Sequence, residues 1–477
     1  MNLAGTPFSG GFKLDIQLSF HGAAGNVTGS CYLLRANDKN ILIDCGLYQE
    51  HDLKARNWER FPMSPHKIDA VVLTHAHLDH CGRLPRLIKF GVDGPIHCTS
   101  ATADIAKIVL MDCGRLNEED AEFKRRRHEK EGRQGPFPEE PLYTEEEAEE
   151  VAKYFQKWNY AQRFELGAGV TCEFIEVGHI LGAACVKITV EQEGEKRTIL
   201  FSGDVGRWDM PILRDPKPIG QADYVVVEST YGNRDHEPTG SIPDELAEIV
   251  NRTAQAGGNI VIPSFAIERT QELLYFLALL CKEDRIPHLR IFVDSPMASQ
   301  VNTVFKRHPF LFDTETIRLA QTIRLDNVTV VRSSQESKSI NHIRGSVIII
   351  AGSGMCTGGR IKHHLCYNIG RPECTVLFVG YQASNTLGRQ ILDGEKQVRI
   401  LGEEYDVKAQ ISRISGFSAH ADRTELLKWL EGLSNTPRRV FVTHGEPDAS
   451  AALAELIREK KGFETVVPAY QDAVSLD

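Results

Sequence analysis

The chain has 477 residues, of which 42% are hydrophobic and 25% are charged, and it carries a formal net charge of −10 at pH 7. This composition is typical of a globular protein with two or three domains. The sequence contains no apolar run of the roughly 18 residues that cross a bilayer, and its negative net charge argues mildly against general electrostatic adhesion to nucleic acid.

The sequence begins without the basic and apolar regions of a signal peptide, and its eleven cysteines include no Cys-x-x-Cys pair. We therefore expect a cytoplasmic protein with reduced thiols.

Short β-strands are predicted for the first 70 residues, at 14–20, 31–34 and 41–43, with glycine-rich turns between them. Asp44 closes the last of these apolar runs. Its side chain is interpreted either as a turn residue or as an acceptor that orients a ligand histidine or a metal-bound water.

The next apolar run, 70–73, leads directly into four potential metal ligands, which are His75, His77, Asp79 and His80. Side chains alternate along extended backbone, so His75 and His77 point to the same side. The following residues read as a turn into a helix, and Asp79 and His80 then approach from another direction. Imidazole and carboxylate are preferred ligands of zinc-type cations, and this arrangement predicts two adjacent metals.

Residues 101–116 have a helical pattern, and the basic run Lys124–His128 follows them. An acidic helix is predicted from Glu145 to Lys157, after a Gly/Pro break at 132–138. The basic run would suit an RNA contact, but we favour a solvated helix face that lies near acidic residues. Strands are predicted next at 170–176, 184–190 and 197–201.

From residue 229 the pattern changes to alternating helices and strands. Helices are predicted at 242–256, 268–282 and 296–307, and strands at 259–262, 290–293, 328–332, 346–351 and 374–379. This alternation predicts βα units on a mostly parallel sheet. After residue 393 short strands return, with helices at 422–432 and 448–461.

Three further ligand candidates follow predicted strands and have glycine neighbours, namely His179, Asp204 and His444. Glycine lets the backbone pack closely around an ion. The seven candidates suit two zinc ions. One would be held by His75, His77 and His179, the other by Asp79, His80 and His444, and Asp204 would lie between them.

The order of Asp44, the His-x-His-x-Asp-His run, His179 and Asp204 resembles the ligand motifs of the metallo-β-lactamase superfamily. Three later motifs resemble those of its β-CASP branch, and they are centred on Glu228, His420 and His444. The resemblance covers essentially the whole chain. It is closest to short prokaryotic relatives of the endonuclease subunit of the cleavage and polyadenylation specificity factor.

This resemblance implies an α/β protein, an αββα metallo-β-lactamase sandwich with an inserted, Rossmann-like β-CASP domain. We expect the sandwich at 1–228 and 394–477 and the insertion at 229–393. The residues support an insertion independently, because the chain between Asp204 and His444 must leave one site and return to it. An inserted domain would lie over the metals and form a cleft.

Two metals about 3.5–4 Å apart generate hydroxide near neutral pH and stabilise charge on a phosphoryl group. We expect His420, oriented by Glu228, to protonate the leaving oxygen, with Asp44 and Asp79 completing the catalytic set. In the resembled family, a histidine at the position of His444 accompanies RNA substrates. We therefore predict a two-zinc endonuclease for single-stranded RNA and leave a 5′ exonuclease activity open; manganese or iron would fit similar ligands.

The glycine-rich stretch that begins at Ser353 and Gly354 follows a predicted strand and ends at Arg360. Backbone N–H groups there could approach a phosphate, and Arg360 could add a bidentate contact. The stretch lacks the Gly-Lys-Ser/Thr end of a P-loop, which argues against nucleotide hydrolysis. Further phosphate contacts are predicted for Ser264, Arg269 and Ser418, although Arg269 would equally suit a salt bridge between domains.

Two other functions remain open. One is a hydrolase with the same metal core that acts on DNA or small esters, which the insertion and the Glu228/His420 pair disfavour. The other is a catalytically silent RNA-binding scaffold, which the complete ligand set disfavours. Single-stranded RNA is the expected partner, no membrane is expected, and the resemblance is compatible with a homodimer.

Overall fold

The structure is a computed structural model that describes residues 15–132, 139–236, 242–322, 326–380, 382 and 385–476. Two seven-stranded sheets and one six-stranded sheet organise these residues. Among the described helices, none combines the length and the apolar composition that a membrane crossing requires.

The first sheet contains both ends of the described chain. Its strands lie in the order β22-β1-β2-β3-β4-β5-β6. Their bounds are Ala473–Leu476, Ile16–Phe20, Tyr32–Ala36, Lys39–Ile43, Ala70–Val72, Ile96–Thr99 and Phe155–Trp158. β22 pairs antiparallel with β1, so the carboxyl-terminal strand closes the amino-terminal sheet.

The second sheet has the order β21-β20-β11-β10-β9-β8-β7. The bounds of these strands are Thr465–Val466, Arg439–Val442, Tyr224–Val227, Glu195–Phe201, Ala184–Gln192, Val170–Glu176 and Arg163–Gly167. β11 and β20 pair in parallel although about 210 residues separate them, with Val227 opposite Val442. The chain therefore leaves the sheet after β11 and returns beside it, as an insertion requires.

The two sheets pack face to face around buried aromatic side chains, including Phe20, Phe174, Phe201 and Phe441. A second buried cluster lies under the helices of this unit. These helices are α1 Leu78–Cys81, α2 Leu84–Lys89, α3 Ser100–Glu131, α4 Glu145–Glu150, α12 Arg423–Leu430 and α13 Pro447–Lys461. Helices outside two stacked sheets make the expected αββα sandwich.

The third sheet is parallel, in the order β14-β13-β15-β12-β16-β19. Its strands are Val328–Val330, Arg290–Asp294, Val347–Ala351, Ile260–Pro263, Thr375–Phe378 and Gln410–Arg413. The helices of this unit are α5 Ile242–Gln255, α6 Arg269–Lys282, α7 Pro296–Arg307, α8 Thr314–Thr322, α9 Ser334–Ile340, α10 Ile361–Asn368 and α11 Leu387–Leu392. A hairpin of β17 Gln397–Ile400 and β18 Glu403–Asp406 completes it.

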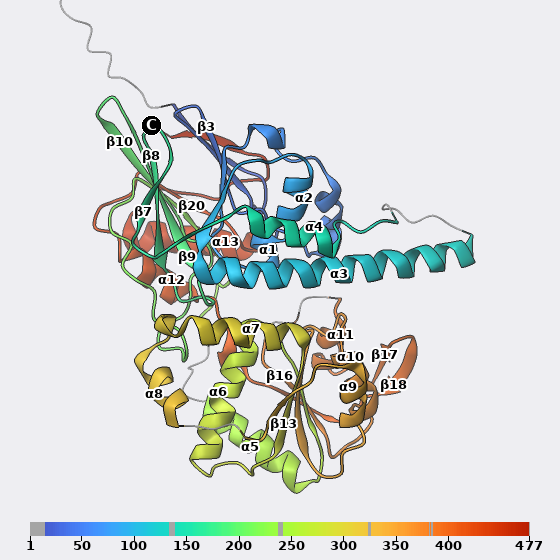
Figure 1. The fold of residues 1–477 in the computed structure, drawn as a ribbon. Helices are drawn as coiled ribbons and strands as arrows, with labels where there is room; N and C mark the ends of the chain where they lie inside the picture. The colour runs from blue at the N-terminus through green and yellow to red at the C-terminus, as the bar shows by residue number, and fades with distance from the viewer. Residues whose placement is uncertain are drawn as a thin grey trace, which may run out of the picture.

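Figure 1 shows this unit on one side of the sandwich, with α7 facing α3. His308, directly after α7, lies 3.1 Å from Asp104 of α3 across the two units. The sheet takes in β19, beyond residue 393, so the expected division of the chain at 229 and 393 stays a prediction.

Two helix predictions differ from the structure. The helix expected at 101–116 continues to Glu131, so the basic run at 124–128 lies on α3 itself. The acidic helix expected to reach Lys157 was wrong beyond Glu150. Residues 155–158 instead form β6 and pair with β5, because sheet pairing outweighs the local helical tendency of the segment.

Candidate metal centre

Seven side chains from four segments of the chain converge at one end of the sandwich. They form two groups in which one ligand atom from each residue lies within 4.8 Å of the others. The groups are His75, His77, His179 and Asp204, and Asp79, His80 and His444. These are the two sets that the sequence analysis singled out, with Asp204 included in the first.

Local geometry explains the convergence. β4 ends at Val72, so His75 and His77 follow on extended backbone, and α1 turns His80 back towards them. The parallel pairing of β11 with β20 brings His444 to the same edge. Gly206 and Gly178 allow the loops of Asp204 and His179 to touch, since a β-carbon at Gly206 would lie 2.2 Å from the Gly178 carbonyl oxygen.

The imidazole nitrogens face one another at short range. His77 Nδ1 lies 3.2 Å from both His75 Nε2 and His179 Nε2. His80 Nε2 lies 3.0 Å from His444 Nε2. Ring nitrogens that converge on a point in this way match a site built to hold cations.

Asp204 lies between the two groups. Its Oδ2 is 3.3 Å from His75 Nε2 and 3.4 Å from His179 Nε2. Its Oδ1 is 3.2 Å from His80 Nε2 and 3.5 Å from His444 Nε2. Both oxygens are buried, and neither has a hydrogen-bond partner among the residues that the structure describes. Because a buried carboxylate without donors is costly, these residues fit bound metal.

The pKa values of the histidines separate into two classes. Burial lowers the pKa of His75 to about 3 and that of His77 to about 4, so both are neutral and available as ligands. Burial also opposes protonation of His80 and His444, but nearby carboxylates outweigh it and raise both pKa values. The site therefore attracts positive charge.

Hydrogen-bonding groups contact the Nδ1 atoms of three candidate ligand histidines and orient their rings. Asp44 Oδ2 lies 2.7 Å from His80 Nδ1, while Asp44 Oδ1 accepts a bond from the Thr74 N–H at 2.8 Å. His444 Nδ1 lies 3.1 Å from the Thr230 hydroxyl, and His179 Nδ1 lies 3.2 Å from the Ala419 carbonyl oxygen. Such contacts fix which nitrogen faces a metal. The sequence analysis identified Asp44 but missed Thr74 and Thr230, whose positions beside the motifs were the available signal.

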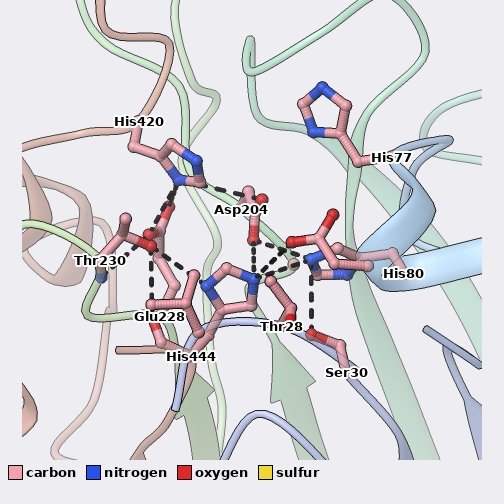
Figure 2. Close-up of polar contacts among 12 residues, drawn as sticks. Thr28, Ser30, His77, His80, Asp204, Glu228, Thr230, His420 and His444 are labelled. Carbon is pink, nitrogen blue, oxygen red and sulfur yellow. Dashed lines mark hydrogen bonds and ion pairs between the residues drawn. The ribbon is translucent and has the colours of Figure 1, made fainter. Parts of the chain in front are cut away.

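Glu228 and His420 form a third group with Asp204. Glu228 Oε1 and Oε2 lie 3.2 and 3.1 Å from His420 Nδ1. Figure 2 shows the two side chains facing each other. Burial alone would lower the pKa of His420, but Glu228 and Asp204 raise it to about 9. The His420 side chain is 22% exposed, so its imidazole remains accessible from solvent. The same geometry would also permit His420 to act as a metal ligand.

The residues expected to bind phosphate lie outside these groups. Ser264 and Gly354 belong to neighbouring loops, since a β-carbon at Gly354 would meet Phe265 at 2.7 Å. Ser353 Oγ accepts bonds from two backbone N–H groups of its own loop, at 3.1 and 3.3 Å. Ser418 Oγ accepts a bond from the His420 N–H at 3.3 Å, which holds the loop of that histidine.

Both arginines expected at the substrate already have carboxylate partners. Arg360 donates to Asp294 at 2.6 Å, and Arg269 forms a buried ion pair with Glu272. Arg269 also lies over the ring of Phe417 at 5.4 Å. Glu272 also lies in α6, so this ion pair is formed within one helix and is not the salt bridge between domains that was the alternative for Arg269. Phosphate binding by either arginine stays a prediction.

Glu268 was missed in the sequence analysis as a functional candidate. It precedes α6, it is 3% exposed, and its Oε2 accepts a bond from the Leu181 N–H at 3.2 Å. Burial and the neighbouring Glu272 raise its pKa well above the usual range. Leu181 follows the candidate ligand His179 by two residues, so the inserted unit holds the loop that carries this histidine.

Three family models match the chain. They are described as the metallo-beta-lactamase superfamily over residues 24–226, the Beta-Casp domain over 270–391, and a Zn-dependent metallo-hydrolase RNA specificity domain over 404–468.

Curated relatives match along nearly the whole chain. The protein named Ribonuclease TTHA0252 of Thermus thermophilus is 38% identical over 440 residues, which cover 91% of this chain and 94% of that protein. The transcription termination factor FttA of Methanocaldococcus jannaschii is 28% identical, covering 96% of this chain and 71% of that factor. An RNase J-like protein of the same organism is 27% identical, with 95% and 98% covered.

Among solved structures, a protein of unknown function from Enterococcus faecalis has a TM-score of 0.54 at 14% identity. The match covers 97% of this chain and all of that one, and it supports the fold alone.

Proposed function

This chain belongs to the metallo-β-lactamase superfamily, in its RNA-specific β-CASP branch, and we propose that it is a metal-dependent ribonuclease that cleaves single-stranded RNA. The observation that carries the proposal is Asp204, a buried carboxylate without donors between two groups of converging histidines. The relatives named as ribonucleases support RNA as the substrate class.

We assign two zinc ions to the two ligand groups, with His75, His77 and His179 at one and Asp79, His80 and His444 at the other. Asp204 would contact both ions. When bound, such cations make a water molecule acidic near neutral pH and offset negative charge on the phosphoryl group. Manganese or iron would suit the same nitrogen and oxygen donors.

His420 supplies the proton that the leaving oxygen requires. Its Nδ1 lies 3.1 Å from Glu228 Oε2, so the carboxylate orients the ring and favours its protonated form. Nε2 is then left to donate a proton. The Val205 N–H donates to Glu228 Oε1 at 2.7 Å and fixes this carboxylate directly beside the loop of Asp204. A departing alkoxide is a poor leaving group, and this pair would remove that barrier.

Asp44 holds His80, while the Ala419 carbonyl holds His179. Ala419 neighbours His420, so one loop orients a metal ligand and also carries the general acid. We assign Ser264, Ser353, Gly354 and Ser418 to substrate binding. The loop of Ser264 lies beside the loop of Ser353 and Gly354, which supports this assignment for those three residues. Cytoplasmic residence and a second copy of the chain as a partner stay predictions.

The test uses four substrates with the purified protein: linear single-stranded RNA, the same RNA circularised, the matching DNA and a small ester. Metal content is measured in parallel, and a chelator serves as the control. We expect cleavage of both RNA forms, lost with chelator and restored by zinc. Cleavage of the linear RNA but not of the circular RNA would indicate an exonuclease, because a circular RNA has no end. Turnover of the ester alone, or no turnover with both metal sites filled, would overturn the proposal.

A further inference from the structure

The carboxyl-terminal half of α3 projects beyond the sandwich, as Figure 1 shows for this 32-residue helix. Its first half is packed, and Gly114 fits against the backbone of Thr144 and Glu145. Beyond that point large apolar side chains are exposed, with Leu116 46% and Phe123 64% accessible. Phe123 is thus a largely exposed aromatic residue on a projecting helix.

The charges on this half of α3 reverse sign about Phe123. At equal separations from it the sequence places opposite charges, in the pairs Glu122/Lys124, Asp120/Arg126, Glu119/Arg127 and Arg115/Glu131. A segment with this symmetry is complementary to a second copy of itself that runs in the opposite direction. A twofold interface requires such self-complementarity.

Two of these pairs, Asp120/Arg126 and Glu119/Arg127, lie on the face that Phe123 occupies. Successive helical residues are rotated by about 100°, and six exposed residues therefore lie within about 60° of Phe123. They are Leu116, Glu119, Asp120, Arg126, Arg127 and Lys130. The returning segment at Glu139 contacts Arg125 and His128 instead, which lie on the opposite side of the helix. Within the described part of the chain, the residues of the Phe123 face are exposed.

We propose that this face is a homodimer interface, in which α3 pairs antiparallel with α3 of a second copy about a twofold axis beside Phe123. The two Phe123 rings meet at the centre. The acidic pair Glu119/Asp120 of each helix lies opposite the basic pair Arg126/Arg127 of the other, and Leu116 packs against the aliphatic stem of Lys130. In this arrangement residue 131 lies opposite residue 115 of the second copy. The paired part of each helix therefore ends where α3 begins to pack against its own globular body.

A solitary helix is the competing explanation. Lys124 pairs with Asp120 at 2.5 Å, Arg127 pairs with Glu131 at 2.8 Å, and Arg126 pairs with Glu122 within the same helix. Such exposed pairs stabilise a lone helix only weakly. They do not explain an exposed aromatic residue at the centre of the charge reversal. The paired helices bury less than the ~800 Å² per partner of a standard interface, so we expect a weak, salt-sensitive dimer.

Sedimentation equilibrium of the full chain tests the proposal, from about 1 to 100 µM and from about 0.05 to 0.5 M salt. We expect reversible dimerisation that weakens as salt rises. Phe123→Glu should remain monomeric over this range. Two charge-reversed variants, Glu119→Lys/Asp120→Lys and Arg126→Glu/Arg127→Glu, should each be monomeric alone. Mixed at equal concentration, they should dimerise again, because each acidic face now meets a basic one.

This mixture controls for any local loss of helix, since an unfolded tip would not recover on mixing. A wild-type chain that is monomeric at 100 µM would overturn the proposal. So would a dimer that the three variants leave unchanged, or variants that bind RNA more weakly without a change in mass. RNA cleavage by each variant is recorded separately, so the outcome for mass does not depend on the proposed catalysis.

Discussion

Two buried aspartates of this molecule have opposite surroundings. Asp294 ends β13 in the inserted unit. Its Oδ1 accepts from Arg360 at 2.6 Å, and its Oδ2 lies 2.7 Å from His364 Nε2 and also accepts from the Ser337 hydroxyl. Asp204 lies three residues after the end of β10 in the sandwich. Several imidazoles surround it, yet neither of its oxygens has a hydrogen-bond partner within the described chain.

The difference separates a structural carboxylate from one that binds a ligand. A buried carboxylate that is saturated by donors stabilises the unit around it and has no capacity left for another cation. A buried carboxylate whose oxygens have no hydrogen-bond partner, and which lies among several imidazoles, is stabilised by a bound cation. The contrast also bears on the predicted role of Arg360. Its guanidinium already forms an ion pair with Asp294, and this pair would compete with phosphate binding.

Asp204→Asn is the most severe test of this contrast. The amide keeps the shape but removes the negative charge between the two ligand groups. We expect loss of bound metal and a fall in RNA cleavage of roughly 10³-fold or more, since metal supplies several kcal/mol of transition-state stabilisation. Metal analysis and single-turnover cleavage measure both effects. Asp294→Asn is the matched control, and equal metal loss in the two variants would refute the distinction.

His420→Ala tests whether the third group belongs to the metal site or to proton transfer. We expect metal content to be unchanged and cleavage to fall by about 10²–10⁴-fold, the usual range for a missing general acid. Glu228→Gln should cause a smaller loss, because the ring keeps a partner but loses the charge that favours its protonated form. Release of metal from His420→Ala would instead identify His420 as a ligand.

Asp294→Asn should act on stability rather than on chemistry. Loss of the charge leaves Arg360 without its counter-ion and weakens the hydrogen bonds around Asp294, and we expect a loss of about 3–5 kcal/mol in unfolding free energy. Burial opposes ionisation of Asp294, but His364, Ser337 and Arg360 lower its pKa. The stabilisation is therefore present above the unfolded value near 3.9 and is lost as pH falls through the folded pKa.

Denaturant titrations of both proteins at several pH values measure this difference. It should be largest near neutral pH and should shrink in acid. A constant difference down to the lowest pH at which the fold persists would mean that the ionised carboxylate is not its source.

Glu268 offers the smallest and most selective effect. Because its carboxyl group is buried with a raised pKa, glutamine resembles its neutral form, and Glu268→Gln should retain nearly full activity. Glu268→Ala removes the acceptor for the Leu181 N–H and loosens the loop of His179. About a tenfold fall in metal affinity or cleavage is expected, as for other residues that orient ligands. A large defect in the glutamine variant would show that the ionised form is required.

The sequence predicted the parts of this molecule whose signals are local. The spacing from His75 to His80 and the strand ends before Asp204 and His444 indicated the candidate ligands that the structure brings together, and helix–strand alternation indicated the parallel sheet. The sequence did not show which side chains already have an ionic partner and are therefore not free to bind a ligand. Asp294 and Arg360, for example, lie 66 residues apart, and no local pattern links them. The end of α4 was missed for the same reason, since pairing with β5 determines where that helix stops.

The pairing of β20 with β11 has a consequence for biosynthesis. Residues 75 to 204 contain one ligand group in full, and they are made in the first half of translation. The second group stays incomplete until His444 has been synthesised and its strand β20 has paired with β11. The two candidate cation groups therefore form at different stages of synthesis, and the second needs a strand that is made about 210 residues after its partner.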